Sequence, residues 1–242
     1  MLSVDAAAVG TAPVLLAAAP GAAPPPGVYA GAASAIAVLV LLVEFGMLRA
    51  PLLRTQVRLY ALQSLLVATL AVVVAAARGI PELYALAGLS LVLKVLIVPG
   101  LVLRLLRDAD AEIAGSGALG VASTVLVGIG AAAFAAFSFG ALDISSVVLP
   151  KTALALSAAV VLVSFVLMIV RGDVVSQAVG FFSLENGVSL ASLVVAAGMP
   201  LILEVAFLFD LLVAVMVFGV LMRVHHARSG GLTTAQLTRL RG

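Results

Sequence analysis

The sequence of 242 residues contains no cysteine and no tryptophan, and only 10% of its residues are charged. The missing cysteines exclude disulfides, and they exclude a thiolate-held iron–sulfur cluster or nickel–iron centre on this chain. Soluble domains carry about 25% charged residues, whereas this chain is 64% hydrophobic and its apolar residues form continuous runs. This composition excludes a soluble enzyme and predicts a protein that lies in a lipid bilayer.

Histidine is scarce as well, and the common motifs for nucleotide binding are missing. The two histidines, His225 and His226, lie side by side in a basic C-terminal segment. We interpret them as part of a basic cytoplasmic surface rather than as a metal site, and no histidine lies inside an apolar run to hold a haem. A P-loop, a dinucleotide fingerprint and a zinc-protease motif are missing. A retinal protein is excluded too, because the last apolar run has no lysine and the chain has no tryptophan.

Seven apolar runs are long enough, at about 20 residues each, to cross roughly 30 Å of hydrocarbon. They cover residues 28–48, 59–77, 83–103, 117–140, 151–170, 174–197 and 201–222. Because lipid offers no partners to backbone groups, the runs are predicted to be α-helices, and the short connections make neighbours antiparallel. The Ala/Pro-rich residues 1–27 are predicted to form a poorly ordered or surface-lying extension. The sequence therefore predicts an all-α, polytopic membrane protein with about seven transmembrane helices.

Lysine and arginine are distributed unevenly between the two sides of this predicted bundle. Only Arg78 and Lys151 lie on one side. The other side carries Arg49, Arg54, Arg58, Arg104, Arg107, Arg171, Arg223, Arg228, Arg239 and Arg241. Cytoplasmic loops are enriched in these residues. We therefore expect the N-terminus outside and the C-terminus in the cytoplasm, with residues 223–242 as a basic cytoplasmic tail.

Five charged residues remain inside the predicted spans, and three of them lie near the midpoints of their runs. These three are Lys94, Glu185 and Asp210, in the third, sixth and seventh runs. A charged side chain at the bilayer centre costs about 2.5–3.5 kcal/mol, so three at one depth need partners or a function. We interpret them as a proton or ion path at mid-membrane. The alternative is a buried structural ion pair that holds helices together.

The other two intramembrane charges, Glu204 and Glu44, lie nearer the ends of their runs. Glu204 is expected close to the outer surface, as the mouth of a path or as a structural partner. Glu44 lies about one turn from the cytoplasmic end of the first run, near Arg49. Its side chain is therefore expected to extend toward water, in a role that is mainly structural, with a part in the proton relay as the alternative.

Two local patterns accompany these charges. Pro99 cannot donate a hydrogen bond to the carbonyl of Val95, so a kink beside Lys94 and a wet polar cavity are expected there. In the sixth run, small residues recur at helical spacing and predict close approach of another helix. These residues are Ser176, Gly180, Ser183 and Gly187, and Glu185, Ser189 and Ser192 follow on the adjoining face. A carboxylate with hydroxyls in line with it is what a proton path needs.

The stretch from Arg171 onward contains the elements LENG and MPLILE…LFD. Together with RLYALQSLL at 58–66, LVLKVLIVP at 91–99 and QLTRLRG at 236–242, it resembles hydrogenase-4 component E (HyfE) over roughly residues 35–242. That family supplies membrane subunits to formate hydrogenlyase and group 4 nickel–iron hydrogenase complexes. Within this resemblance, residues 28–170 hold the first five helices.

Residues 171–222 also resemble the K subunit (NuoK) of respiratory complex I, which is related to a subunit of Mrp-type cation/proton antiporters. Arg171 matches an arginine-bearing loop, Glu185 a mid-membrane glutamate and Asp210 a second central carboxylate. Asp210 departs from the pattern, which has a glutamate there. Lys94 fits the component E pattern, and Glu204 has no obvious counterpart in the K subunit.

The resemblance implies a non-catalytic membrane subunit of a complex I-like oxidoreductase in the bacterial cytoplasmic (inner) membrane. It would link antiporter-like subunits and a membrane anchor subunit to a peripheral hydrogenase-type or other redox module, and its carboxylates would serve proton translocation. No cofactor is expected on this chain, because the nickel–iron and iron–sulfur centres belong to partner subunits, and no nucleic acid is an expected partner. A subunit of an Mrp-like antiporter or other ion-coupled transport assembly without a redox arm is the alternative.

Overall fold

The described part of the chain consists of helices that run up and down a single bundle. The computed structural model describes residues 27–108, 114, 119–140, 152–195 and 219. These form α1 (Gly27–Arg49), α2 (Leu53–Arg78), α3 (Pro81–Ser90), the π-helix η1 (Leu91–Ile97), α4 (Val98–Asp108), α5 (Val121–Gly140), α6 (Thr152–Val170) and α7 (Val174–Val195). No strand occurs in these ranges. The all-α prediction is therefore confirmed for this part of the chain.

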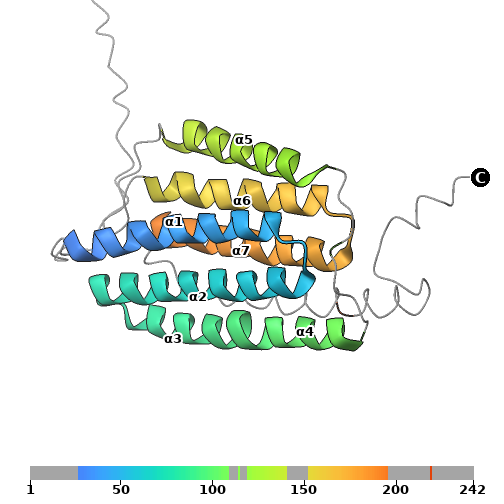
Figure 1. Cartoon of the computed structure of the whole chain (residues 1–242). Helices are drawn as coiled ribbons and strands as arrows, with labels where there is room; N and C mark the ends of the chain where they lie inside the picture. The colour runs from blue at the N-terminus through green and yellow to red at the C-terminus, as the bar shows by residue number, and fades with distance from the viewer. Residues whose placement is uncertain (1–26, 109–113, 115–118, 141–151, 196–218, 220–242) are drawn as a thin grey trace, which may run out of the picture.

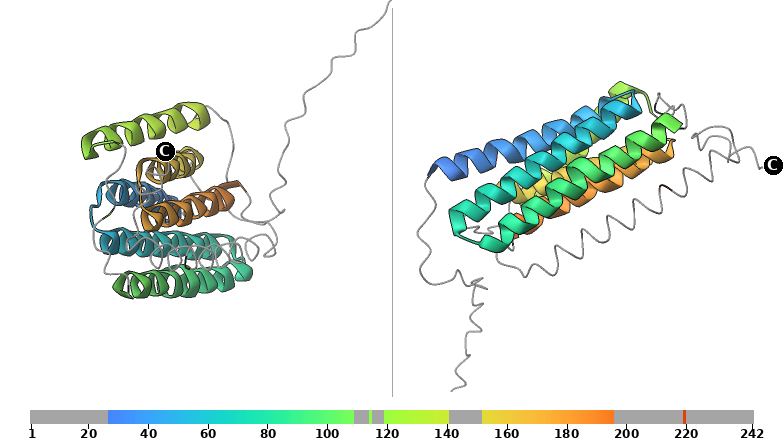
Figure 2. Two further views of the ribbon diagram at one scale, coloured as in Figure 1. Left: turned by 90° about the vertical axis from the view of Figure 1, so that its right-hand side faces the viewer. Right: turned by 90° about the horizontal axis from the view of Figure 1, so that it is seen from below.

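The helices are stacked in layers with α6 and α2 next to the centre. In Figure 1, α5 covers α6 at the top, and α3, η1 and α4 continue one another along the bottom edge below α2. Figure 2 shows α1 and α7 on opposite sides of the bundle, with α6 above them and α2 below. This arrangement makes α1, α2, α6 and α7 the four helices that surround the middle of the bundle.

Five stretches are long and apolar enough to cross a membrane, and they correspond to the first five predicted runs. They are Tyr29–Arg49, Leu53–Arg78, Pro81–Arg107, Val121–Gly140 and Thr152–Val170. The sixth run forms α7, which also carries serines, a glutamine, an asparagine and a glutamate, and it is not among these five. Those polar residues face other helices rather than lipid, as described below. The seventh run, residues 201–222, lies outside the described residues apart from Gly219.

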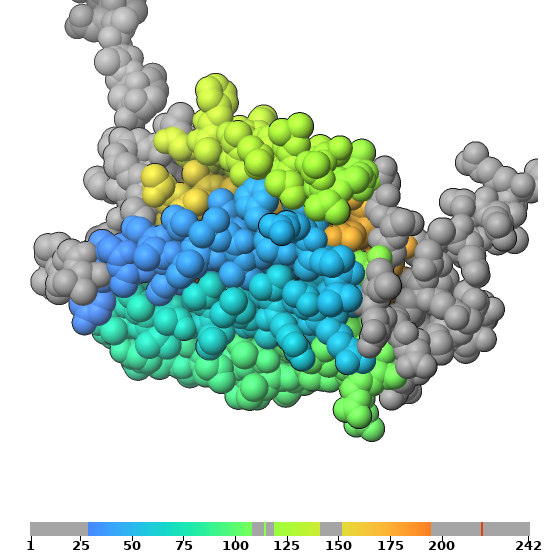
Figure 3. All heavy atoms as spheres, viewed as in Figure 1, coloured from blue at the N-terminus to red at the C-terminus, as the bar shows by residue number. Residues whose placement is uncertain are grey.

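Polar residues lie inside this bundle and apolar residues cover its surface. Phe137, Ile169 and Leu126 are among the most exposed side chains, with 84%, 77% and 69% of their surface accessible. Figure 3 shows α5, which carries two of them, spread over one side of the molecule. Glu44 and Lys94, by contrast, are buried. An apolar surface of this kind suits contact with lipid tails, which identifies the molecule as a membrane protein.

The small-residue face of α7 packs closely against a neighbouring helix. A Cβ atom added to Gly180 would lie 2.6 Å from Cγ of Met168, and one on Gly187 would lie 3.1 Å from the backbone nitrogen of Val161. Both neighbours belong to α6. Only glycine allows the two helix backbones to approach this closely. The predicted close approach is therefore confirmed, with α6 as the partner.

Two loops meet at one end of the bundle, and an arginine joins them. Arg171, between α6 and α7, donates from Nη2 to the carbonyl oxygens of Leu48 and Ala50, each at 2.9 Å. Asp173 accepts a hydrogen bond from the Ser176 backbone N–H at 2.7 Å and so caps α7. Partial burial lowers the pKa of Arg171 and nearby Asp173 opposes this, but a guanidinium remains cationic at neutral pH.

Candidate functional site

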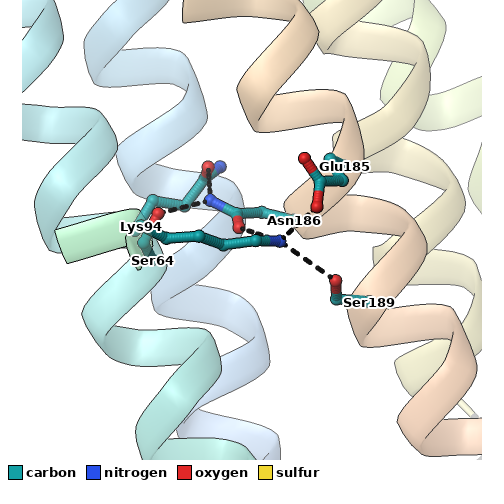
Figure 4. Close-up of polar contacts among 6 residues, drawn as sticks. Ser64, Lys94, Glu185, Asn186 and Ser189 are labelled. Atoms are coloured by element: carbon teal, nitrogen blue, oxygen red, sulfur yellow. Dashed lines mark hydrogen bonds and ion pairs between the residues drawn. The ribbon is translucent and has the colours of Figure 1, made fainter. Parts of the chain in front are cut away.

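Lys94 and Glu185 meet inside the bundle although they lie far apart in the sequence. Lys94 is in η1 and Glu185 in α7, and Lys94 Nζ lies 2.9 Å from Glu185 Oε1. Figure 4 shows the lysine side chain extending across to α7. The two side chains are only 3% and 11% exposed. Two of the three mid-run charges therefore form a buried ion pair.

The helix widens where it carries Lys94. The N–H of Val98 bonds to the carbonyl of Leu93, five residues earlier, and Pro99, which has no N–H to donate, follows directly. π-Helical turns of this kind interrupt regular α-helices, often at functional sites. Where a kink was predicted beside Lys94, the structure has the π-helix η1, and Lys94 lies at its middle.

A cavity of about 40 Å³ lies beside the ion pair, between α2, α3 and α7. Its polar lining includes Lys94, Glu185, Ser90, Ser189 and Ser192. A buried water needs roughly 10–15 Å³ by this measure, so the cavity has room for a few water molecules. A cavity beside Lys94 is therefore confirmed, and the two hydroxyls predicted to follow Glu185 line it, whereas its being filled with water stays a prediction. Ser189 Oγ also lies 3.4 Å from Lys94 Nζ.

Glu44 forms a second acidic site and is fully buried. Its carboxylate accepts hydrogen bonds from Gln63 Nε2 at 2.8 Å and from Ser164 Oγ at 3.1 Å, and it also contacts Ser183 Oγ. The expectation that Glu44 extends toward water near Arg49 is therefore wrong. Glu44 belongs to the stripe of α1 that faces the other helices, three residues before Met47, and this position directs it inward.

Two amide side chains join the acidic sites. Gln63 Oε1 accepts hydrogen bonds from Asn186 Nδ2 at 3.0 Å and from Ser183 Oγ at 2.9 Å. Asn186 Nδ2 also donates to Ser64 Oγ at 2.9 Å, and Asn186 Oδ1 lies 3.4 Å from Lys94 Nζ. Figure 4 shows Asn186 between Ser64 and Lys94. An unbroken series of polar contacts therefore runs from Glu44 to Glu185 through the centre of the bundle.

Sequence reasoning did not identify Gln63 as part of the site. A signal was present, because Gln63 is an amide inside the apolar run 59–77, and Gln56 precedes it by seven residues and therefore lies on the same face of α2. Both are fully buried, and both are partners of serines on α7: Gln56 Oε1 accepts from Ser176 at 2.8 Å. Buried amides in a membrane helix need partners as charged residues do.

The remaining predicted site residues cannot be placed. Glu204, Asp210 and the pair His225 and His226 lie outside the described residues. Within the ranges that the structure describes, no group of three histidine, aspartate or glutamate side chains is arranged to hold a metal ion. The described site is therefore made of one ion pair, one further carboxyl group and the amides and hydroxyls between them.

Comparisons with known proteins are sparse. No protein-family model matches the chain, and no solved structure matches it. Part of the chain is similar to an uncharacterized protein of Mycobacterium tuberculosis, Rv0085, with 46% identity over 63 residues. The similarity spans 26% of this chain and 29% of that protein, and the relative's name describes no activity.

Proposed function

We propose that this chain is an integral membrane subunit of a complex I-like, membrane-bound hydrogenase-type oxidoreductase, in which its buried carboxylates serve proton translocation. The observation that supports this most is the Lys94–Glu185 pair, buried beside a cavity in the middle of the bundle. Both residues also lie in the elements that resemble component E, LVLKVLIVP and LENG.

The chemistry of the pair suits a proton path. When Glu185 is ionised, Lys94 holds it at 2.9 Å. A proton on Glu185 weakens that attraction, and Lys94 retains Asn186 and Ser189 as partners at 3.4 Å each. Water in the adjoining cavity can bring the proton to the carboxylate. A buried pair of this kind therefore responds to a single proton with a change in its own geometry.

The proposal includes a membrane orientation and a set of partners. Residues 201–222 complete seven crossings of a bacterial cytoplasmic membrane, with the N-terminus outside and the C-terminus in the cytoplasm. The contact of Arg171 with the loop after Leu48 supports this orientation, because it brings two arginine-bearing loops to one end of the bundle. The partners are antiporter-like subunits, a membrane anchor subunit and a peripheral redox module that carries the metal centres.

The first experiment is purification of the tagged full-length chain in mild detergent, followed by mass spectrometry of the proteins that accompany it. We expect antiporter-like subunits together with a nickel–iron large subunit and iron–sulfur proteins. Antiporter-like partners without any metal-bearing subunit would contradict the oxidoreductase assignment and favour the transport assembly. Recovery of the chain without such partners would contradict both.

A further inference from the structure

The hydrogen bonds from Lys94 through Asn186 and Gln63 to Glu44 point in the same direction. Asn186 presents Oδ1 to the Lys94 ammonium and donates from Nδ2 to Gln63 Oε1. Gln63 in turn donates from Nε2 to Glu44 Oε2. Each amide therefore accepts on the side of Lys94 and donates on the side of Glu44. The aligned dipoles favour a positive charge at one end of this series and a negative charge at the other.

The network holds more acid than base. Among the described residues that take part, Lys94 is the one cation, and Glu44 and Glu185 are both carboxyl groups. Tyr60, which is buried near Glu185, is a phenol and adds no charge at neutral pH. With both carboxyl groups ionised, these described residues together carry a net charge of minus one inside a membrane bundle. Binding one proton removes that unfavourable charge.

The surroundings of Glu44 accommodate this proton. The single hydroxyl hydrogen of Ser183 cannot serve Glu44 Oε2 and Gln63 Oε1 at once, although its oxygen contacts both. If Glu44 is protonated, its own O–H donates to Ser183 and Ser183 donates to Gln63. Both contacts are then satisfied without movement of any heavy atom. The same site holds the ionised form through the bond from Gln63 Nε2.

We propose that this network binds one exchangeable proton, for which Glu44 and Glu185 compete, and that Gln63 and Asn186 couple the two carboxyl groups without carrying the proton. A carboxamide does not titrate at neutral pH. The two amides therefore transmit the electrostatic influence of one carboxyl group to the other and do not carry the proton itself. Glu185 exchanges its proton through the adjoining cavity. The inference rests on the proposed function, because the coupling between the two carboxyl groups would serve proton translocation.

Infrared spectroscopy of the purified full-length chain in lipid nanodiscs, recorded as a pH titration, tests this coupling. The C=O band of a protonated Glu44 is identified by its loss in Glu44→Gln and its retention in Glu82→Gln, a change at an exposed residue of α3. In Glu185→Gln, Lys94 no longer has a carboxylate beside it and acts more strongly on Glu44. We expect Glu44 then to ionise at a pH lower by about one unit or more, the size that marks coupled sites.

Removal of an amide tests the link itself. We expect Gln63→Met to cut that shift by more than half, whereas Gln56→Met, at an equally buried glutamine of α2, leaves it unchanged. Asn186→Ala interrupts the same series at its other amide and serves if Gln63→Met does not fold. A Glu44 band that titrates at the same pH with and without Glu185 would overturn the proposal, as would equal effects of the two glutamine variants.

The titration separates this inference from the proposed function, because it requires no turnover and no partner subunit. Coupled titration in a chain that binds no redox module would leave the inference standing and contradict the oxidoreductase assignment. If the two carboxyl groups titrate independently in a chain that co-purifies with the whole redox complex, the inference is overturned and the oxidoreductase assignment stands.

Discussion

Asn186 donates a hydrogen bond from Nδ2 to Oε1 of Gln63 over 3.0 Å, and this contact joins two acidic sites inside the bundle. On one side of it lies the Lys94–Glu185 pair, and on the other lies Glu44. Neither residue of the contact is charged. Two neutral amides therefore determine whether the buried carboxyl groups act separately or together.

Glu185→Gln should reduce proton-coupled turnover by about tenfold or more and leave assembly intact. Glutamine keeps the volume and hydrogen-bonding capacity of the side chain but cannot ionise, and a positioned proton-transfer group contributes at least this much. Turnover and proton uptake measured in membrane vesicles, with the amount of assembled complex as reference, check this. Full proton pumping in an assembled Glu185→Gln, Asp210→Asn double variant would contradict a relay.

Lys94→Met should destabilise the protein by about 3–5 kcal/mol, because it leaves Glu185 buried without its cation. Adding Glu185→Gln to Lys94→Met should restore most of the lost stability, since the unpaired charge is then removed as well. Thermal unfolding in detergent compares the two variants with the unmodified chain. If the double variant is no more stable than Lys94→Met alone, the two residues do not form the buried pair described above.

Ser183→Ala should lower the free energy of unfolding by about 0.5–1.5 kcal/mol, because it removes one hydrogen-bond partner of Glu44 and Gln63. Glu44 Oε2 then keeps Gln63 Nε2 as its partner, and Gln63 Oε1 keeps Asn186 Nδ2. Ser157→Ala is the matched control. Ser157 is as well buried, but its hydroxyl bonds only to the carbonyl of Leu154 in its own helix, at 2.7 Å. Chemical denaturation of the two variants under identical conditions measures the difference. Equal losses would argue against a special role for Ser183.

Gly187→Ala should destabilise the bundle by about 1–3 kcal/mol, because the added Cβ would press against the backbone of α6 at Val161. Gly130→Ala, on the exposed side of α5, places its Cβ in open space and should be neutral or slightly stabilising. Thermal unfolding of the two variants side by side tests the contact. A neutral Gly187→Ala would show that α6 and α7 are less tightly packed than the structure has them.

The boundaries of the helices show what hydropathy can and cannot predict. The second run was predicted over 59–77, whereas α2 begins at Leu53. Arg54 and Arg58 ended the apolar run in the sequence, but arginine is a good helix former and continues the helix beyond the hydrocarbon. The fifth run agrees closely with the structure, because α6 covers Thr152–Val170 and the prediction was 151–170.

The sequence by itself determined that the protein is helical and apolar, which helices are long enough to cross a membrane, and that Lys94 and Glu185 lie in the interior. Each of these properties depends on neighbouring residues along one run, so composition and spacing are sufficient to predict it. The small-residue face of α7 belongs to the same group, because helical periodicity alone defines it.

Only the tertiary structure decided which inward-facing residues meet. Periodicity predicts that a side chain points into the bundle, but not which of several neighbouring helices it faces or at what depth it finds a partner. Glu44 was expected near water for this reason, although it bonds to Gln63 and Ser164 on two other helices. Pairing between helices depends on how they are stacked and rotated, and no single run of the sequence contains that information.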